Sequence, residues 1–255
     1  MLNDLWRYRD LVRYLVGRDL KVRYRRSFIG FLWTMLQPLL TMLVLYIVFS
    51  SLFRFSIASY PVYVLAGLLF WNFFQQSIIT SMNSLRTNSA LLLKLPVPNV
   101  VFPVATVLSG VVNLLLALLP AVLIVIVTGH RPTPALLFLP VSILIAALFT
   151  LGAGLLLAPL AVFFSDVVEL VGVGMTLLYF LTPIFYPKEI LPAQLAPLVR
   201  FNPVRSILEV FRDPIYNGKV PPLSHLAVAA ALAVVVLLIG AMAFRRSCNR
   251  IPFYI

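Results

Sequence analysis

The sequence predicts an all-α integral membrane protein that crosses the membrane with six helices. Of its 255 residues, 62% are hydrophobic and 11% are charged, whereas soluble domains average about 45–50% apolar and about 25% charged residues. The chain also contains six apolar windows of about 20 residues or more, which is the length a helix needs to cross the hydrocarbon layer. Lys and Arg are concentrated between these windows in a pattern that distinguishes two sides. We therefore expect a single transmembrane domain over residues 1–255.

The N-terminal segment, residues 1–27, predicts an amphipathic helix on the cytoplasmic surface of the membrane. On a helical projection its apolar side chains share one face; they are Leu5, Tyr8, Leu11, Val12, Leu15 and Val16. Arg13, Arg18 and Lys21 fall on the other face. Two interpretations remain open. The helix is either a simple membrane anchor, whose bases are attracted to anionic headgroups, or a structural part of the translocation machinery.

The six predicted spans follow the amphipathic segment. They cover residues 29–53, 60–82, 103–128, 134–161, 167–186 and 223–244.

The charge distribution orients these spans. Lys and Arg outnumber Asp and Glu by 20 to 8, an excess that in a soluble protein would suggest a nucleic-acid partner. Here it indicates topology, and we expect no nucleic-acid partner. Eight of the bases lie in residues 1–27, and five more lie between the second and third spans or after the last. The short loops of the opposite side hold only Arg54 and Arg131. The positive-inside rule therefore places both termini in the cytoplasm.

The segment 84–98 predicts a stiff cytoplasmic elbow. Ser84 to Lys94 is a short helix candidate, and Pro96 and Pro98 prevent it from continuing into the next span. By spacing alone, an ordinary connector is the simpler interpretation.

The segment 187–222 predicts two short re-entrant helices on the outer side. It holds seven prolines, too many for a continuous span. One helix is expected from an apolar face at helical spacing, formed by Val204, Ile207, Leu208 and Phe211, with Arg205, Glu209 and Arg212 opposite. Asp213-Pro214 would end it, and Leu191 to Arg200 would form its partner.

Catalytic signatures are missing from the sequence. A phosphate-binding loop requires two glycines followed by Lys and Ser or Thr, and the nearest match, Gly218-Lys219, lacks the first Gly and the hydroxyl residue. Ion-coupled carriers usually hold an ionisable residue at mid-membrane, and the predicted spans have almost none. We expect no enzymatic activity, no metal site and no cofactor in this chain.

Aromatic residues gather in the second and fifth spans. The candidates for a substrate path are Tyr63, Phe70, Trp71, Phe74, Tyr179 and Phe180. Aromatic residues near span ends usually form interfacial belts, but sugar rings also stack on aromatic faces. Both interpretations stay open.

Several motifs in order along the chain carry a resemblance to a known family. They are Arg18 to Ser27 with Gly30, Trp33 and Gln37-Pro38-Leu39; Asn88 to Pro103; Phe163 to Asp166; Thr182 to Pro187; and Asn202-Pro203 to Phe211-Arg212. Taken together, they resemble the permeases of ABC transporters that export polysaccharides such as O-antigen, capsule and teichoic acid. Two departures, Ser165 and Leu95 to Pro98, affect the expected cytoplasmic entrance and coupling contacts.

The resemblance implies a bacterial inner-membrane homodimer with a translocation path between its subunits for lipid-linked polysaccharide. Two separate cytoplasmic ATPase subunits would bind ATP and Mg²⁺ and hydrolyse the ATP. The elbow would be the coupling helix, with Arg86, Asn88, Leu92 and Lys94 as candidate residues. The N-terminal helix, with Arg13, Arg18 and Lys21, would meet the same ATPase. The outer gate would include Phe185, Tyr186, Asn202, Pro203 and Phe211. The alternatives are an ABC exporter of a lipid or drug, an ion-coupled carrier or membrane transferase, and a structural scaffold.

Overall fold

The computed structural model describes residues 6–24, 32–52, 59–94, 96–127, 133–187, 194 and 196–254, and every regular element in these ranges is helical. In chain order the elements are α2 (Arg9–Tyr24), α3 (Leu32–Leu52), α4 (Tyr60–Thr87), α5 (Ser89–Lys94), α6 (Val101–Val127), η1 (Pro134–Phe138), α7 (Leu139–Phe163), α8 (Val167–Leu181), α9 (Ala196–Arg200), α10 (Pro203–Arg212), η3 (Asp213–Asn217), α11 (Leu223–Ser247) and η4 (Ile251–Phe253).

Four helices are long and apolar enough to cross a membrane. They are α4, α6, the helix that η1 and α7 form together, and α11. These four candidate spans match the second, third, fourth and sixth predicted spans. The windows of the first and fifth spans are occupied by α3 and α8, whose apolar helical stretches, Leu36–Val48 and Val167–Leu181, are shorter. The count of six spans therefore stays a prediction.

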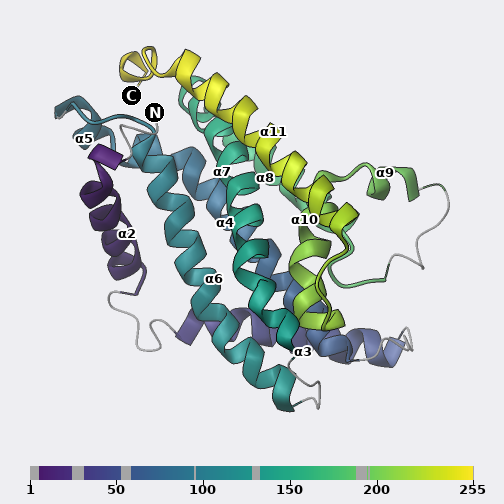
Figure 1. Cartoon of the computed structure of the whole chain (residues 1–255). Coiled ribbons are helices and arrows are strands. Elements are labelled where there is room, and N and C mark those ends of the chain that lie inside the picture. The colour runs from purple at the N-terminus through teal and green to yellow at the C-terminus, as the bar shows by residue number, and fades with distance from the viewer. Residues whose placement is uncertain are drawn as a thin grey trace.

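The long helices form one bundle. α7 contacts α11, α4 and α6, and α4 also contacts α6, whereas α3 runs across the others at one end of the bundle (Figure 1). The closest approach is between α7 and α11. A Cβ atom on Gly152 would lie 2.5 Å from the backbone nitrogen of Leu237, and one on Gly240 would meet the carbonyl oxygen of Gly152. Glycine at both positions lets the two backbones touch, as small residues commonly do between membrane helices.

Helix α2 packs onto protein rather than only onto lipid. It contacts α6, and the side chain of Leu15 is 1% exposed. Leu15 and Val12 join a cluster with Leu85, Phe102 and Phe244 that is separate from the main core of the bundle. Of the two interpretations of the N-terminal helix, this packing favours a structural part of the machinery over a simple anchor. Leu5 lies outside the described residues.

The elbow begins later than predicted. Ser84 belongs to the last turn of α4, and the break lies at Asn88, whose backbone leaves the helical conformation with φ −107° and ψ 20°. The Asn88 side chain donates from Nδ2 to the carbonyl oxygen of Ser84 at 2.7 Å and so pairs one of the last carbonyls of α4. α5 follows as a separate six-residue helix. We call this end of α4 the α5 end, and the end at Tyr60 the α10 end.

Helix α8 ends earlier than predicted. The fifth span was expected to reach residue 186, but the helix stops at Leu181 and Thr182 is extended. Pro183 explains this end, because proline disfavours a helical conformation in the residue that precedes it. The segment 182–187 then turns back against α4, where it meets α10.

Helix α10 largely follows the prediction, with one correction. Val204, Ile207, Leu208 and Phe211 are buried as expected, and Arg205 and Glu209 form an ion pair at 2.8 Å. The α-helix also ends before Asp213-Pro214, where a π-helical turn, η3, follows. Arg212 was expected on the polar face and is instead buried. Of its predicted partner helix, the structure describes only α9.

Candidate functional site

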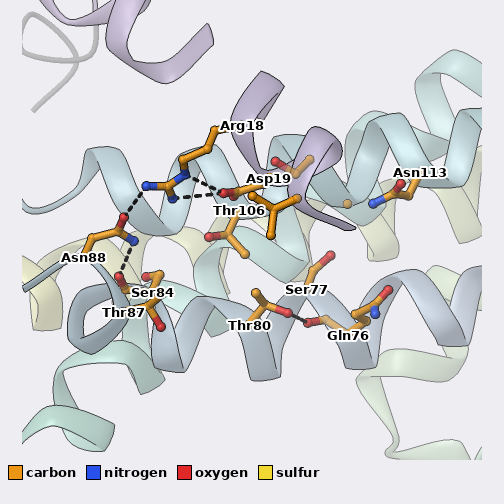
Figure 2. A pocket seen from close by; sticks show the side chains of 13 residues that line it. Arg18, Asp19, Gln76, Ser77, Thr80, Ser84, Thr87, Asn88, Thr106 and Asn113 are labelled. Atoms are coloured by element: carbon orange, nitrogen blue, oxygen red, sulfur yellow. Dashed lines mark hydrogen bonds and ion pairs between the residues drawn. The ribbon is translucent and has the colours of Figure 1, made fainter. Parts of the chain in front are cut away.

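A polar cavity lies between α2, α4 and α6, at the α5 end of the bundle. Its volume is about 460 Å³, within the range of roughly 300–1,000 Å³ typical of small-ligand sites. We call it the polar pocket (Figure 2). It is lined by Arg18, Asp19 and Val22 from α2; Gln76, Ser77, Thr80, Ser84 and Thr87 from α4, with the adjacent Asn88; and Thr106, Ser109, Gly110 and Asn113 from α6.

Helical spacing brings these polar side chains together. On α6, Thr106, Ser109 and Asn113 stand at i, i+3 and i+7, so they share one face. On α4, Ser77, Thr80, Ser84 and Thr87 stand at i, i+3, i+7 and i+10 and likewise share one face. The two stripes face each other because α4 and α6 pack together. This site was not predicted from the sequence, although polar residues at helical spacing within apolar helices indicate it.

Most hydroxyl groups of the pocket already donate their proton to a backbone carbonyl of their own helix. Thr80, Ser84, Thr106 and Ser109 each donate to a carbonyl oxygen three or four residues earlier in their own helix, at 2.7, 2.7, 3.0 and 2.9 Å. A hydroxyl has one proton to donate but two lone pairs. The oxygens of these side chains therefore remain available to accept hydrogen bonds.

Arg18 closes the pocket on the α2 side. Its guanidinium donates from Nη1 to Oδ1 of Asn88 at 2.9 Å and from Nη2 to Oδ1 of Asp19 at 2.9 Å. The structure thus turns Arg18 inward, whereas Arg13 and Lys21 of the same predicted set are exposed. Because Asn88 directly precedes α5, this contact joins α2 to the elbow.

Ser77 presents an unusual hydroxyl. The side chain is 2% exposed, and its Oγ atom has no hydrogen-bond partner within the described part of the chain. Gly110 makes room for it, because a Cβ atom at that position would clash with this Oγ. Ser81, one turn along α4, also has a buried hydroxyl without a partner in the described residues, but it faces Gly154 of α7, outside the pocket.

The predicted coupling residues differ in exposure. Arg86 and Lys94 are exposed, Leu92 is half-buried and Asn88 is buried. Arg86 donates from Nη2 to the carbonyl oxygen of Val162 at 3.3 Å. The structure therefore brings Asn88 and Leu92 inward and leaves Arg86 and Lys94 on the surface. Their role in coupling stays a prediction.

A second polar cluster lies at the α10 end and surrounds Arg212. This guanidinium is 5% exposed and donates to the carbonyl oxygens of Pro183 at 2.8 Å and Ile184 at 3.0 Å. It also lies 3.9 Å above the ring of Tyr63, in cation–π geometry. Burial acts to lower the pKa of Arg212, and the neighbouring Tyr63 and Glu209 act in the opposite direction. We call Arg212, Tyr63, Gly67, Pro183 and Ile184 the Arg212 cluster.

The cluster fixes the segment that follows α8. The Tyr63 hydroxyl lies 3.1 Å from the carbonyl oxygen of Pro183 and 2.9 Å from that of Tyr186. Gly67 allows the close approach of α4, since a Cβ there would lie 2.5 Å from Nη2 of Arg212 and 2.9 Å from the carbonyl oxygen of Ile184.

Asn202 connects α10 to the same segment. Its Oδ1 accepts from the backbone nitrogen of Val204 at 3.0 Å and caps α10, while its Nδ2 donates to Oγ1 of Thr182 at 2.9 Å. Of the other predicted gate residues, Phe211 is fully buried against Phe70, with ring centres 5.9 Å apart. Pro203 is the first residue of α10.

The predicted path aromatics fall into two groups. Tyr63, Phe70, Trp71 and Phe74 are buried within this chain, whereas Tyr179 and Phe185 are half-buried and Phe180 is 59% exposed. The groups touch, because the ring centres of Trp71 and Tyr179 are 5.3 Å apart. From Tyr179 the ring contacts continue to Phe180, Phe185 and Tyr186. In this conformation the α4 rings pack against protein, and a role in substrate binding stays a prediction for all six residues.

Known proteins are similar in sequence to this chain along most of its length. The family model described as ABC-2 type transporter matches residues 10–216. Over 239 residues the chain is 34% identical to the O-antigen export system permease protein RfbA of Myxococcus xanthus, covering 93% of this chain and 92% of that protein. It is 30% identical to RfbA of Klebsiella pneumoniae over 82% of this chain and 81% of the relative. It is 23% identical to the polysialic acid transport protein KpsM of Escherichia coli over 92% of both.

Proposed function

The chain belongs to the ABC-2 type transporter membrane family, and we propose that it is the permease subunit of an ATP-driven exporter of lipid-linked polysaccharide. The observation that carries this proposal is the near full-length similarity to permeases named for O-antigen export. The substrate would be a glycan that is built on a lipid carrier in the cytoplasm and moved across the bacterial inner membrane. ATP and Mg²⁺ would be bound by separate cytoplasmic subunits.

The α5 end offers a contact surface for such an ATPase. Leu93 and Lys94 of α5 and Arg13 of α2 are exposed there. α2 and the elbow are tied together twice: the Tyr8 hydroxyl donates to the carbonyl oxygen of Pro96 at 3.1 Å, and Arg18 contacts Asn88. A displacement of α5 would therefore pull on both α2 and α4. This arrangement supports the assignment of α5 as the coupling helix.

A second copy of the chain would complete the path. α8 presents an apolar stripe of Leu170, Val173, Leu177 and Phe180, all exposed. Gly172 lies open beside it, with nothing within 4 Å of a Cβ built on it, and Thr176 follows four residues later. A small residue at every fourth position lets membrane helices approach closely. These features support a homodimer in which α8 faces its counterpart, with the exposed Phe180 beside the path.

Within that dimer we expect six spans and cytoplasmic termini. A helix of the length of α3, 21 residues, extends about 32 Å at 1.5 Å per residue, which is long enough to cross the hydrocarbon layer. In the structure α3 runs across the end of the bundle (Figure 1), so as a span it would have to turn parallel to the other helices. α8 has 15 residues, about 22 Å by the same rule, so the segment 182–187 would complete its crossing. The Arg212 cluster then lies at the outer end, where it would hold the gate segment closed.

An affinity purification tests this function. The tagged chain is purified from its native membrane, the co-purifying proteins are identified, and ATPase activity is assayed with lipid-linked glycan and with small amphiphiles. We expect a stoichiometric ABC ATPase whose activity rises with the glycan. A Leu93→Asp variant should lose the ATPase while remaining in the membrane. A chain that transports without an ATPase would overturn the proposal, and stimulation only by small amphiphiles would point to a lipid or drug exporter.

A further inference from the structure

We propose that the polar pocket binds a neutral, hydroxyl-rich sugar residue of the exported glycan. This inference rests on the proposed function and deepens it, because it assigns a substrate subsite to residues of α2, α4 and α6. The pocket would engage the glycan at the cytoplasmic side, before it enters the path between two subunits.

The hydrogen-bonding character of the lining matches a sugar. The committed hydroxyls of Thr80, Ser84, Thr106 and Ser109 offer acceptor oxygens. Donors come from Arg18, because a guanidinium has five N–H groups and only three of those here are directed at Asp19 and Asn88. The side-chain amides of Gln76 and Asn113 and the Ser77 hydroxyl add further donor groups to the lining. A ligand that fits must therefore both donate and accept. Sugar hydroxyls do both.

The Ser77 hydroxyl independently indicates a ligand. A buried hydroxyl without a hydrogen-bond partner is unfavourable, and such a group in a functional cavity calls for an explanation. Ser77 lines the pocket, and its Oγ atom packs against Gly110, where the missing Cβ leaves room for it. Because the Ser77 Oγ atom is itself covered, it would have to rotate towards the pocket to pair with a sugar hydroxyl seated between α4 and α6, and this pairing would remove the unsatisfied group.

The charge balance disfavours the phosphate of a lipid carrier. Among the described residues of the lining, Arg18 and Asp19 are ionisable, and they pair with each other at 2.9 Å. A phosphate group at neutral pH offers acceptors but few donors, so it would leave the Asp19 carboxylate and the acceptor oxygens of Thr80, Ser84, Thr106 and Ser109 without a donor from the ligand. Each hydroxyl would have to give up its bond to the helix backbone in order to donate to the phosphate. A neutral sugar requires no such change.

The volume and position suit a transient contact with a polymer. A cavity of about 460 Å³ holds one or a few sugar rings but not a long glycan. None of the described lining residues is aromatic, so binding to them would rest on hydrogen bonds that exchange with water, which favours release. Asn88 belongs to the pocket and also precedes α5, so an occupied pocket would contact the elbow directly.

A cysteine protection assay on the purified complex tests this inference. Val22, on the rim of the pocket and 65% exposed, is replaced by cysteine in a Cys248→Ser background, and its alkylation rate by N-ethylmaleimide is measured. Methyl glycosides of glucose, galactose, mannose and rhamnose are the probes, with inorganic phosphate and pyrophosphate as comparisons. Tyr14→Cys, equally exposed at 67% on the same helix but outside the pocket, is the control.

We expect at least one glycoside to slow alkylation at position 22 several-fold and to leave position 14 unchanged. Ser77→Ala should weaken this protection about three- to tenfold. Ser81→Ala removes a matched buried hydroxyl outside the pocket and should not weaken it. Protection by phosphate or pyrophosphate alone would overturn the sugar assignment.

Export of the native glycan by the same complexes separates this inference from the proposed function. A complex that exports glycan normally, but whose pocket no glycoside protects at molar excess, would refute the pocket and leave the function standing. Equal loss of protection in Ser77→Ala and Ser81→Ala would also refute it, because the effect would then not come from the pocket. A complex that exports no glycan would instead count against the proposed function.

Discussion

Replacing Gly67 by alanine should destabilise the protein through the Arg212 cluster. The added Cβ would lie 2.5 Å from Nη2 of Arg212 and 2.9 Å from the carbonyl oxygen of Ile184. Neither group can move freely. The guanidinium is held by the carbonyl oxygens of Pro183 and Ile184 and is almost fully buried, and the second obstacle is backbone. The new methyl group therefore has to push α4 away from the segment after α8.

The structure gives the size of this effect. Forcing an extra carbon into a packed interior costs about 1–3 kcal/mol, and weakening a hydrogen bond from a charged donor costs about 1.5–3 kcal/mol when it is lost completely. The higher helix propensity of alanine stabilises the folded helix by about 1 kcal/mol relative to glycine. We expect a net destabilisation of about 2 kcal/mol, equivalent to a roughly 30-fold change in the unfolding equilibrium.

The matched control is Gly17→Ala in α2. Nothing lies within 4 Å of a Cβ built on Gly17, so this change should show the propensity gain alone, about 0.5–1 kcal/mol of stabilisation. Both variants are unfolded by titration with sodium dodecyl sulfate in mixed micelles. Intrinsic tryptophan fluorescence, to which the buried Trp71 beside Tyr179 contributes together with Trp6 and Trp33, reports the loss of tertiary packing.

The sign of the difference decides the test. If Gly67→Ala is as stable as the wild-type protein, or more stable in the manner of Gly17→Ala, the close contact between α4 and the Arg212 cluster is wrong. In that case the segment after α8 is not fixed by Arg212, and its assignment as a gate loses its structural basis.

Three further predictions follow from the same contacts. Asn202→Ala should destabilise the protein by about 1–2 kcal/mol in the same titration, because α10 loses its N-cap; an unchanged midpoint would contradict this. Phe70→Ala should cost about 3–5 kcal/mol because the ring is fully buried, whereas Phe180→Ala should leave stability unchanged and reduce glycan export if the exposed ring lines the path. Val173→Cys, in a Cys248→Ser background, should form a disulfide-linked dimer on membranes treated with a mild oxidant, and a chain that stays monomeric there would contradict a dimer through α8.

The family, the long apolar helices and the buried face of α10 could be predicted from the sequence. Apolar windows of sufficient length specify α4, α6, α7 and α11, because a lipid environment requires long apolar helices whatever their neighbours are. Proline positions set boundaries, and the apolar spacing of Ile207, Leu208 and Phe211 identified the buried face of α10. These are local properties, which the order of residues carries directly.

The functional sites depend on contacts between distant segments. Each polar stripe, on α4 and on α6, is visible in the sequence, but nothing in either stripe indicates that they face each other or that Arg18 closes the space between them. Helical periodicity placed Arg18 and Arg212 on polar faces directed outward. The structure turns both inward, because Asn88 accepts a hydrogen bond from one, and the carbonyl oxygens of Pro183 and Ile184 accept from the other.

The sequence by itself therefore determined the class of the protein and most helix boundaries, since these follow from hydropathy and from the backbone restrictions of proline. Only the tertiary structure decided where the polar groups are satisfied. A guanidinium that packing turns inward must find partners wherever the packed helices supply them, and the oxygens of Asn88, Pro183 and Ile184 that accept from Arg18 and Arg212 lie 28 to 70 residues away along the chain.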